Sequence, residues 1–238
     1  MEFVQRLTTE AGLLAEQDLL AAVCAGERPH GLLFWQPTDH ALVMPRRMNR
    51  LANFDIACAE LAASGWPVLL RETGGEPVPQ SAATVNVALV YIAPRSEGDQ
   101  NRLELAYHRL CDPLCSALAA WGGEPSLGEV EGAFCDGRYN VNLDQRKWVG
   151  TAQRWRQSHD LPGYGRRPVV LVHGAMLMDD QRAAMVGAVN RFNQQCSIAQ
   201  RCRADSHIAL HERFAALDLF ERLSNDYGRM LAEVSAKG

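Results

Sequence analysis

Residues Thr84–Ala93 read TVNVALVYIA, and this stretch has the strongest strand character in the chain. It is rich in β-branched side chains, which favour the extended backbone of a sheet, and it carries one amide, Asn86. We therefore predict a buried strand here. Shorter apolar runs predict further strands at Gly31–Gln36, Ala41–Met44, Pro67–Leu70 and Pro168–Val172, the last of which ends at His173-Gly174.

Between these strands, apolar residues recur at the three- and four-residue spacing of amphipathic helices. The first helix is predicted over Thr9–Ala25, with Thr9 as its N-cap. This interleaving, without a linker or a repeat, predicts an α+β fold: a single domain over residues 1–238 with a mixed β-sheet flanked by helices. The other predicted elements are helices at Ala52–Ser64, Leu103–Trp121, Asp180–Asn193 and His211–Ser235, and a hairpin from Asn140–Leu143 to Lys147–Gln153 with its turn at 144–146.

The composition excludes several classes of protein. The 238 residues carry 24 Lys+Arg against 28 Asp+Glu, so no global basic field exists and we expect no nucleic-acid partner. No apolar run reaches 18 residues, which argues against a transmembrane helix and a membrane partner. The opening MEFVQRLTTEAG lacks the features of a signal peptide. Seven scattered cysteines, an odd number, indicate reduced thiols, so we expect a cytoplasmic protein.

Residues 70–77 (LRETGGEP) are the first of four segments that could carry chemistry. Arg71 precedes Gly74 and Gly75, and a glycine pair lets a ligand approach the backbone, whose N–H groups can hold an anion. A simple tight turn is the commoner meaning of such a pair. The segment is neither a GxxxxGK[ST] phosphate loop nor a GxGxxG dinucleotide motif.

The second and third segments lie on or next to predicted strands. Lys147 is followed by Gly150, Thr151 and Ala152, which would leave room for a ligand beside the sheet. A surface lysine beside a packing glycine is the alternative. His173 at the end of PVVLV would be either a general base or a structural histidine with satisfied hydrogen bonds.

The fourth segment is the loop GAFCDGRY (132–139), which places Cys135 before the strand of Lys147. A nearby ammonium favours the reactive thiolate form of cysteine, although a lone cysteine is most often an inert small hydrophobe. No metal site is predicted, because two other pairs lack the partners of a zinc site. These pairs are Cys111 with Cys115, and His207 with His211.

The order of these segments resembles the lipoate-protein ligase A and octanoyltransferase family, the lipoyl branch of the biotin/lipoate protein ligases. In that family an arginine with a glycine-rich turn precedes a strand containing Asn, then a lysine strand, then a strand with HG. The resemblance covers roughly residues 13–178 and implies a biotin/lipoate protein ligase-like fold. The matching stretches are LRETGGEPVPQ (70–80), TVNVALVY (84–91), QRKWVGTAQRW (145–155) and VLVHGAML (170–177).

The resemblance also implies an activity. Such proteins hold a lipoyl or octanoyl chain in an apolar tunnel and pass it to a lysine of a lipoyl carrier domain. The implied carriers are the glycine cleavage H protein or a 2-oxoacid dehydrogenase E2 subunit, with acyl carrier protein as a further partner. Lys147 would stabilise the oxyanion that develops during transfer. The implied substrate-binding residues are Arg71, Gly74, Gly75, Asn86, Gly150, Thr151, Ala152, His173 and Gly174.

Two chemistries occur in this family: ligases activate lipoate with ATP and Mg, whereas transferases form a cysteine acyl-enzyme. Here Glu76 replaces the third glycine of the turn, and its carboxylate would repel a phosphate. This favours a transferase with Cys135 as the nucleophile, with Cys196 or Cys202 as alternatives. An ATP-dependent ligase and a non-catalytic member that binds an acyl ligand or lipoyl-type partner stay open. We expect no tightly bound cofactor and no separate C-terminal accessory domain.

Overall fold

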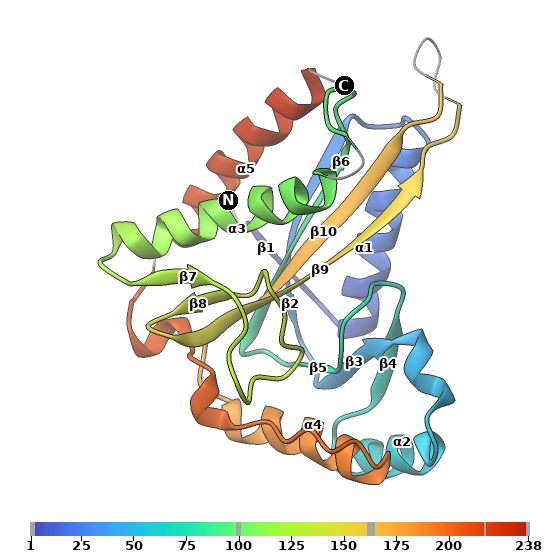
Figure 1. The fold of residues 1–238 in the computed structure, drawn as a ribbon, viewed down its shortest axis with the longest axis vertical. Coiled ribbons are helices and arrows are strands. Elements are labelled where there is room, and N and C mark those ends of the chain that lie inside the picture. Colours follow the sequence, from blue (N-terminus) through green and yellow to red (C-terminus); the bar gives the residue numbers. More distant parts are fainter. Residues whose placement is uncertain (1–2, 99–100, 161–164, 217, 237–238) are drawn as a thin grey trace.

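A seven-stranded sheet runs through the centre of the computed structural model, which describes residues 3–98, 101–160, 165–216 and 218–236 (Figure 1). All neighbouring strands in it pair antiparallel except β1 and β2, which are parallel. In spatial order its strands are β1 (Val4–Leu7), β2 (His30–Pro37), β6 (Thr84–Ile92), β10 (Pro168–Leu177), β9 (Arg146–Gln157), β8 (Val141–Leu143) and β7 (Pro125–Leu127).

The strand predicted at Thr84–Ala93 is confirmed as β6, which is buried along nearly its whole length between β2 and β10. The hairpin is also confirmed: β8 and β9 are joined by Asp144 and Gln145, whose φ angles of 50° and 62° suit a tight two-residue turn. The predicted end of the PVVLV strand is wrong. Strand β10 continues to Leu177, so His173 and Gly174 lie within it and pair with Ala152 and Thr151 of β9.

Helix α1 (Thr9–Cys24) covers one face of the large sheet. Its side chains Leu20 and Val23 pack against β-strand residues such as Val90 and Leu171. The predicted N-cap is one residue off, because the hydroxyl of Thr8 accepts the hydrogen bond from Ala11 N, and Thr9 is the first helical residue.

Helices α3 (Arg102–Ala120) and α5 (Leu219–Ala236) cover the opposite face (Figure 1). Tyr227 of α5 is fully buried and donates its hydroxyl proton to the carbonyl of Leu110 on α3 at 2.6 Å. The helix predicted from His211 is wrong at its start. Residues Leu210–Glu212 form a short 3₁₀ turn, in which the Glu212 carboxylate accepts from Ala209 N.

A second, three-stranded sheet lies beside the large one, in the order β4 (Val68–Arg71), β3 (Ala41–Pro45) and β5 (Val78–Gln80). Helices α2 (Phe54–Ala63) and α4 (Arg182–Gln195) pack against each other next to it (Figure 1). The α+β class with helices on both faces of a mixed sheet is confirmed. The separate small sheet was not predicted, and Arg71 is the last residue of its strand β4.

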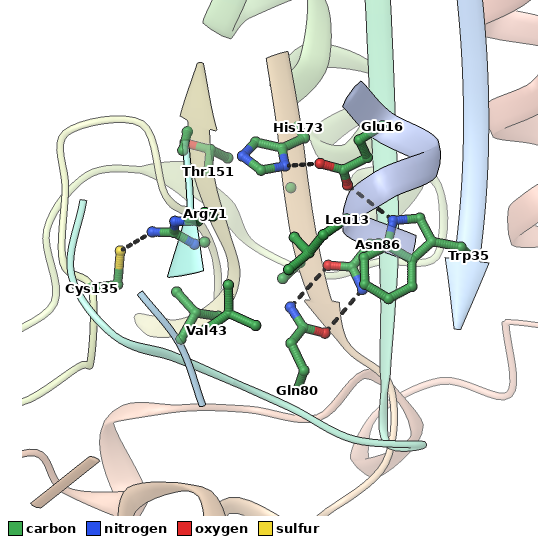
Figure 2. A pocket seen from close by; sticks show the side chains of 15 residues that line it. Leu13, Glu16, Trp35, Val43, Arg71, Gln80, Asn86, Cys135, Thr151 and His173 are labelled. Atoms are coloured by element: carbon green, nitrogen blue, oxygen red, sulfur yellow. Dashed lines mark hydrogen bonds and ion pairs between the residues drawn. The ribbon is translucent and has the colours of Figure 1, made fainter. Parts of the chain in front are cut away.

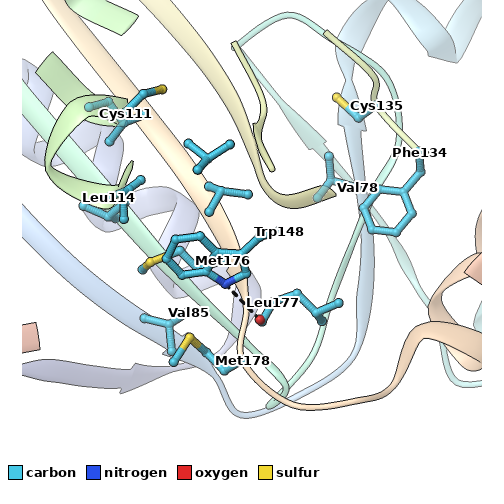
Figure 3. Close-up of a cluster of buried hydrophobic side chains, with 14 of the residues drawn as sticks. Val78, Val85, Cys111, Leu114, Phe134, Cys135, Trp148, Met176, Leu177 and Met178 are labelled. Carbon is cyan, nitrogen blue, oxygen red and sulfur yellow. Dashed lines mark hydrogen bonds between the residues drawn. The ribbon is translucent and has the colours of Figure 1, made fainter. Parts of the chain in front are cut away.

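The hydrophobic core on the α3 and α5 side extends beneath the loop that precedes β8 (Figure 3). Trp148 is buried there and donates its indole N–H to the carbonyl of Leu177 at 3.1 Å. Phe134 and Cys135 belong to the same core, next to Val78 (Figure 3). The loop of Cys135 is therefore a packed part of the protein.

In the described part of the chain, no helix is long and apolar enough to cross a membrane.

Candidate active site

Four residues, two of them small, form a row across four strands on the α1 face of the large sheet. Strand pairing places Trp35 opposite Asn86, Asn86 opposite Ala175, and Ala175 opposite Gly150. Directly opposed residues point to the same face of a sheet. Because Ala175 and Gly150 fill little of this face, the register leaves a hollow between Trp35 and the loop of Cys135.

This hollow is a pocket of about 400 Å³, counting the part that opens to solvent (Figure 2). Most of the predicted site residues line it, although Gly74, Gly75 and Lys147 do not. The predicted residues in its wall are Arg71, Asn86, Cys135, Gly150, Thr151, Ala152, His173 and Gly174. The remaining lining residues, which the sequence did not single out as site residues, are Leu13, Glu16, Trp35, Val43, Val78, Gln80 and Ala175.

Two donors point at the sulfur of Cys135. The backbone N–H of Glu76 lies 3.3 Å from Sγ, and Nη2 of Arg71 lies 3.8 Å from it. Gly75 permits this approach: its φ is +99°, and a Cβ there would lie 3.0 Å from Sγ. The sulfur therefore lies among hydrogen-bond donors, one of them a guanidinium.

The buried side chain of Lys147 is hydrogen-bonded to the backbone of the Cys135 loop. Its Nζ donates to the carbonyls of Phe134 at 2.5 Å and Cys135 at 2.7 Å, and only 2% of the residue is exposed. Burial lowers the pKa of this ammonium. Gly150 makes room for the side chain, since a Cβ there would lie 3.2 Å from Nζ. Lys147 thus contacts the backbone carbonyls of Phe134 and Cys135, and it lies outside the wall of the pocket.

The backbone of Cys135 has a φ of 47°, a left-handed conformation that is uncommon for residues other than glycine. Such conformations persist where the surroundings fix them, and they concentrate at functional sites. Asp136 supplies part of that support, because its carboxylate accepts from Val130 N, Gly137 N and Asn140 Nδ2. These contacts and those of Lys147 fix the direction of the thiol.

His207 is a further support that the sequence did not reveal. Its Nδ1 lies 2.9 Å from the carbonyl of Arg203 and must donate to it, so Nε2 accepts from the N–H of Phe134 at 3.2 Å. The imidazole also stacks on the ring of Phe134. Burial, followed by the charge of Lys147, lowers the pKa of His207 to about 4. The histidine is therefore neutral at physiological pH.

This arrangement predicts a pH-dependent stability. Because the folded-state pKa of His207 lies below its unfolded value of about 6.5, the unfolded state binds more protons between about pH 4 and 6.5. We expect the contribution of His207 to the free energy of unfolding to be fully present above that window. This contribution should decrease as the pH drops through the window. His207→Gln should flatten this slope by about one proton in urea unfolding series, whereas His108→Gln, on a half-exposed position of α3, should not. An unchanged slope in His207→Gln would contradict the assignment.

Hydrogen-bonded pairs occupy the polar part of the pocket wall (Figure 2). Gln80 and Asn86 exchange amide hydrogen bonds of 2.9 and 3.0 Å, so both amides are satisfied. Glu16 of α1 accepts from Trp35 Nε1 at 2.9 Å and contacts Nδ1 of His173 at 2.8 Å. A carboxylate on the apolar side of the predicted first helix was the signal in the sequence that could have identified Glu16.

A second, wider pocket of about 700 Å³ shares Leu13, Glu16, Arg71 and His173 with the first. Its other walls carry charged and polar groups, and it forms a polar vestibule beside the first pocket. Thr73 Oγ1 and Arg71 Nε are buried there without a hydrogen-bond partner among the described residues. The residues specific to this vestibule are Gln17, Leu20, Glu72, Thr73, Arg154, Arg156 and Leu171.

The other cysteines considered as nucleophiles lie elsewhere. Cys196 follows α4 and Cys202 lies in the loop after it, and neither lines the pockets described here. Burial raises the pKa of both thiols, that of Cys202 to about 11. Cys111 and Cys115 lie on α3, where burial raises the pKa of each. Within the described ranges, no group of three or more His, Cys, Asp or Glu residues is placed to hold a metal ion.

Residues 10–215 match the family model of the lipoyl protein ligase A/B catalytic domain. The chain belongs to this family. Its lipoyl protein ligase A/B domain includes every residue of the pocket described above. The resemblance stated from the sequence is confirmed.

Two similar proteins are more than 30% identical to this chain. The chain is 33% identical over 208 residues to an octanoyl-[GcvH]:protein N-octanoyltransferase of Kyrpidia tusciae, covering 86% of this chain and 69% of that protein. It is 31% identical to an uncharacterized protein of Cupriavidus necator, covering 82% and 78%.

Solved structures show the same fold at lower identity. A putative lipoate protein ligase from T. acidophilum with bound lipoic acid has a TM-score of 0.65 and 16% identity, covering 97% of this chain and 84% of that one. A lipoate-protein ligase A bound with ATP has a TM-score of 0.64 and 14% identity, with the same coverage. These matches confirm the ligase-like fold of the lipoyl protein ligase A/B family.

Proposed function

We propose that this protein transfers an octanoyl or lipoyl group to a lysine of a lipoyl carrier domain, through a thioester on Cys135. The observation that carries this proposal is the thiol itself. Cys135 lies at the wall of the pocket, with Glu76 N–H and Arg71 directed at Sγ. The name of the Kyrpidia tusciae relative supports the same acyl group and a GcvH donor. We place the activity in the cytoplasm, with no tightly bound cofactor.

The pocket suits the reaction in two respects. Its apolar wall of Leu13, Trp35, Val43 and Val78 would bury the acyl chain, which the hydrophobic effect favours. Its polar end would hold the reacting carbonyl beside Sγ. Attack of the thiolate on the donor carbonyl forms the C–S bond and releases the donor, and a lysine amine then displaces Sγ.

Arg71 and the N–H of Glu76 have a second use in this scheme. Both are preorganised beside Sγ, where a negative charge develops on the acyl oxygen during attack. Arg71 is fixed by its own hydrogen bonds to the carbonyls of Gly74 and Glu76, at 2.8 and 3.1 Å. The expected oxyanion contacts therefore come from the glycine turn. Lys147 would fix the geometry of the loop of Cys135 and place a buried ammonium next to it.

An ATP-dependent lipoate ligase is the second candidate, because one structural neighbour contains ATP and another contains lipoic acid. ATP and its Mg²⁺ would enter only in that case. In this chain the N–H of Glu76 already points to Cys135, and the Glu76 carboxylate places negative charge in the same turn. A non-catalytic member that binds an acyl ligand or a lipoyl-type partner is the third candidate.

One acceptor assay separates these three activities. The protein is incubated with a lipoyl domain as acceptor in three parallel reactions. The donor is octanoyl-GcvH in the first, an octanoyl carrier thioester in the second, and lipoate plus ATP in the third. The mass of the acceptor is then measured. We expect a mass gain of one octanoyl group without ATP. A gain seen only with lipoate and ATP would establish the ligase, and no gain from any donor would leave a binding role.

A further inference from the structure

Four arginines from three segments of the chain meet at the glycine turn beside Cys135. Nη2 of Arg71, at the end of β4, lies 3.8 Å from Sγ (Figure 2). Arg47 donates to the carbonyl of Gly75 at 2.6 and 3.0 Å, and a Cβ on that glycine would lie 3.0 Å from Sγ. The other two bind the carboxylate of Glu72 in the same turn, and we call the four residues the arginine rim. These two are Arg46, next to Arg47 in the chain, and Arg154 of β9.

Lysine is scarce in this chain. Of the 24 lysines and arginines in the sequence, 22 are arginines, and the two lysines are Lys147 and Lys237. Lys237 lies outside the described residues. Lys147 lines neither the first pocket nor the vestibule. Among the described residues, the lysine or arginine side chains that line these two pockets are all arginines, namely Arg71, Arg154 and Arg156.

The choice between the two cations matters because of the acyl group on Cys135. The acceptor of the proposed reaction is a neutral lysine amine that attacks the thioester, so any other amine close to Sγ would compete with it. An ammonium exchanges with its neutral, nucleophilic form, whereas a guanidinium in a protein stays protonated. A side chain held beside the thioester would also react at a high effective concentration. Arginine therefore supplies positive charge at this turn without a nucleophilic nitrogen.

The position of Lys147 follows the same rule. Burial lowers the pKa of its ammonium, so the neutral amine is more populated than that of an exposed lysine. Its Nζ is held by the carbonyls of Phe134 at 2.5 Å and Cys135 at 2.7 Å. These two bonds keep the nitrogen against the backbone of the loop, outside the wall of the pocket. The one lysine in the described part of the chain is thus fixed by hydrogen bonds and is not presented to the pocket.

We propose that the arginine rim prevents the acyl group on Cys135 from passing to the protein itself, so that it is kept for the lysine of the partner; this inference rests on the proposed function. The excluded reaction is a transfer from sulfur to nitrogen within one chain. A neutral amine would form the new N–C bond, the C–S bond would break, Sγ would leave as the thiolate, and the excess proton of the nitrogen would pass to water. The product would be an amide, which traps the acyl group on the protein. The arginines of the rim therefore determine which amine is acylated.

The test introduces an amine into the rim without changing its charge. The wild type, Arg47→Lys and Arg47→Gln are acylated with octanoyl-N-acetylcysteamine, a small thioester, and the excess reagent is removed. After a series of incubation times, neutral hydroxylamine cleaves the thioester but not an amide, and the remaining octanoyl groups are located by peptide mass spectrometry. Per acylated molecule, we expect Arg47→Lys to accumulate a hydroxylamine-resistant octanoyl group at position 47 about tenfold or more faster than the wild type does at any position. Arg47→Gln should not exceed the wild type, because it carries no amine.

Arg154→Lys is a second variant, which decides the question if Arg47→Lys does not acquire the thioester. It should trap the octanoyl group in the same way, whereas Arg229→Lys, on an exposed position of α5, is the matched control without a resistant adduct. Thioesters that stay as sensitive to hydroxylamine in the rim variants as in the wild type would overturn the inference. A resistant octanoyl group on Lys147 of the wild type would also overturn it. Failure of the wild-type protein to acylate Cys135 would instead overturn the proposed function.

Discussion

Cys135→Ser is expected to lower acyl transfer by about three orders of magnitude or more, because the substitution removes the nucleophile of a covalent mechanism. The hydroxyl of serine has no base within its described hydrogen bonds, since the partners of Sγ are the donors Glu76 N–H and Arg71. The rate of acceptor octanoylation measures the loss. The variant should also form no stable acyl adduct from an octanoyl thioester.

Cys115→Ser is the matched control for this substitution. Cys115 is a half-buried thiol on α3, away from the pocket that contains Cys135. Its serine variant should transfer at a rate close to that of the wild type, and both variants should unfold cooperatively. Substantial octanoylation by Cys135→Ser would contradict covalent catalysis at this position.

Lys147→Met is expected to reduce the rate of Cys135 acylation by about 10²–10³-fold, comparable to the loss of one fixed electrostatic contact in an active site. The substitution keeps most of the side-chain volume but leaves the carbonyls of Phe134 and Cys135 without their donor. Each buried carbonyl left unpaired costs about 1–3 kcal/mol, so the free energy of unfolding should fall as well. Single-turnover acylation and urea unfolding measure the two effects.

Two variants test whether the loop contact is responsible. Gly150→Ala places a methyl group 3.2 Å from Nζ of Lys147 and should cause a smaller loss in the same direction. Arg146→Met, on the neighbouring and more exposed position of β9, should leave acylation unchanged. If Lys147→Met acylated Cys135 at the wild-type rate, the loop would not depend on the buried ammonium.

The elements with long, regular apolar patterns were predictable from the sequence. Strand β6 and the helices have long, periodic apolar patterns, and the turn of the β8–β9 hairpin has a polar tip. Strands β1, β5 and β7 have only three or four residues each, too few for a pattern to stand out. The extension of β10 beyond Val172 was missed because a histidine interrupts the apolar run, and its compatibility with the sheet depends on Glu16.

The site was predictable where its residues belong to segments that resemble the family. The resemblance identified Cys135, Arg71 and the small residues of β9, and the structure places them around one pocket. Support from His207, more than seventy positions beyond Phe134, depends on tertiary contacts that no local pattern encodes. The contact expected of Lys147 with the substrate was inferred from the resemblance to the family, whereas the direction of the side chain is set by its burial next to Gly150.

The most direct test of the account is the mass of the protein after incubation with octanoyl-GcvH in the absence of ATP. We predict a mass increase of one octanoyl group, located on the peptide that contains Cys135, which disappears when a lipoyl domain is added and reappears on its lysine. An unmodified Cys135, with the acceptor octanoylated or lipoylated only when ATP is supplied, would contradict it.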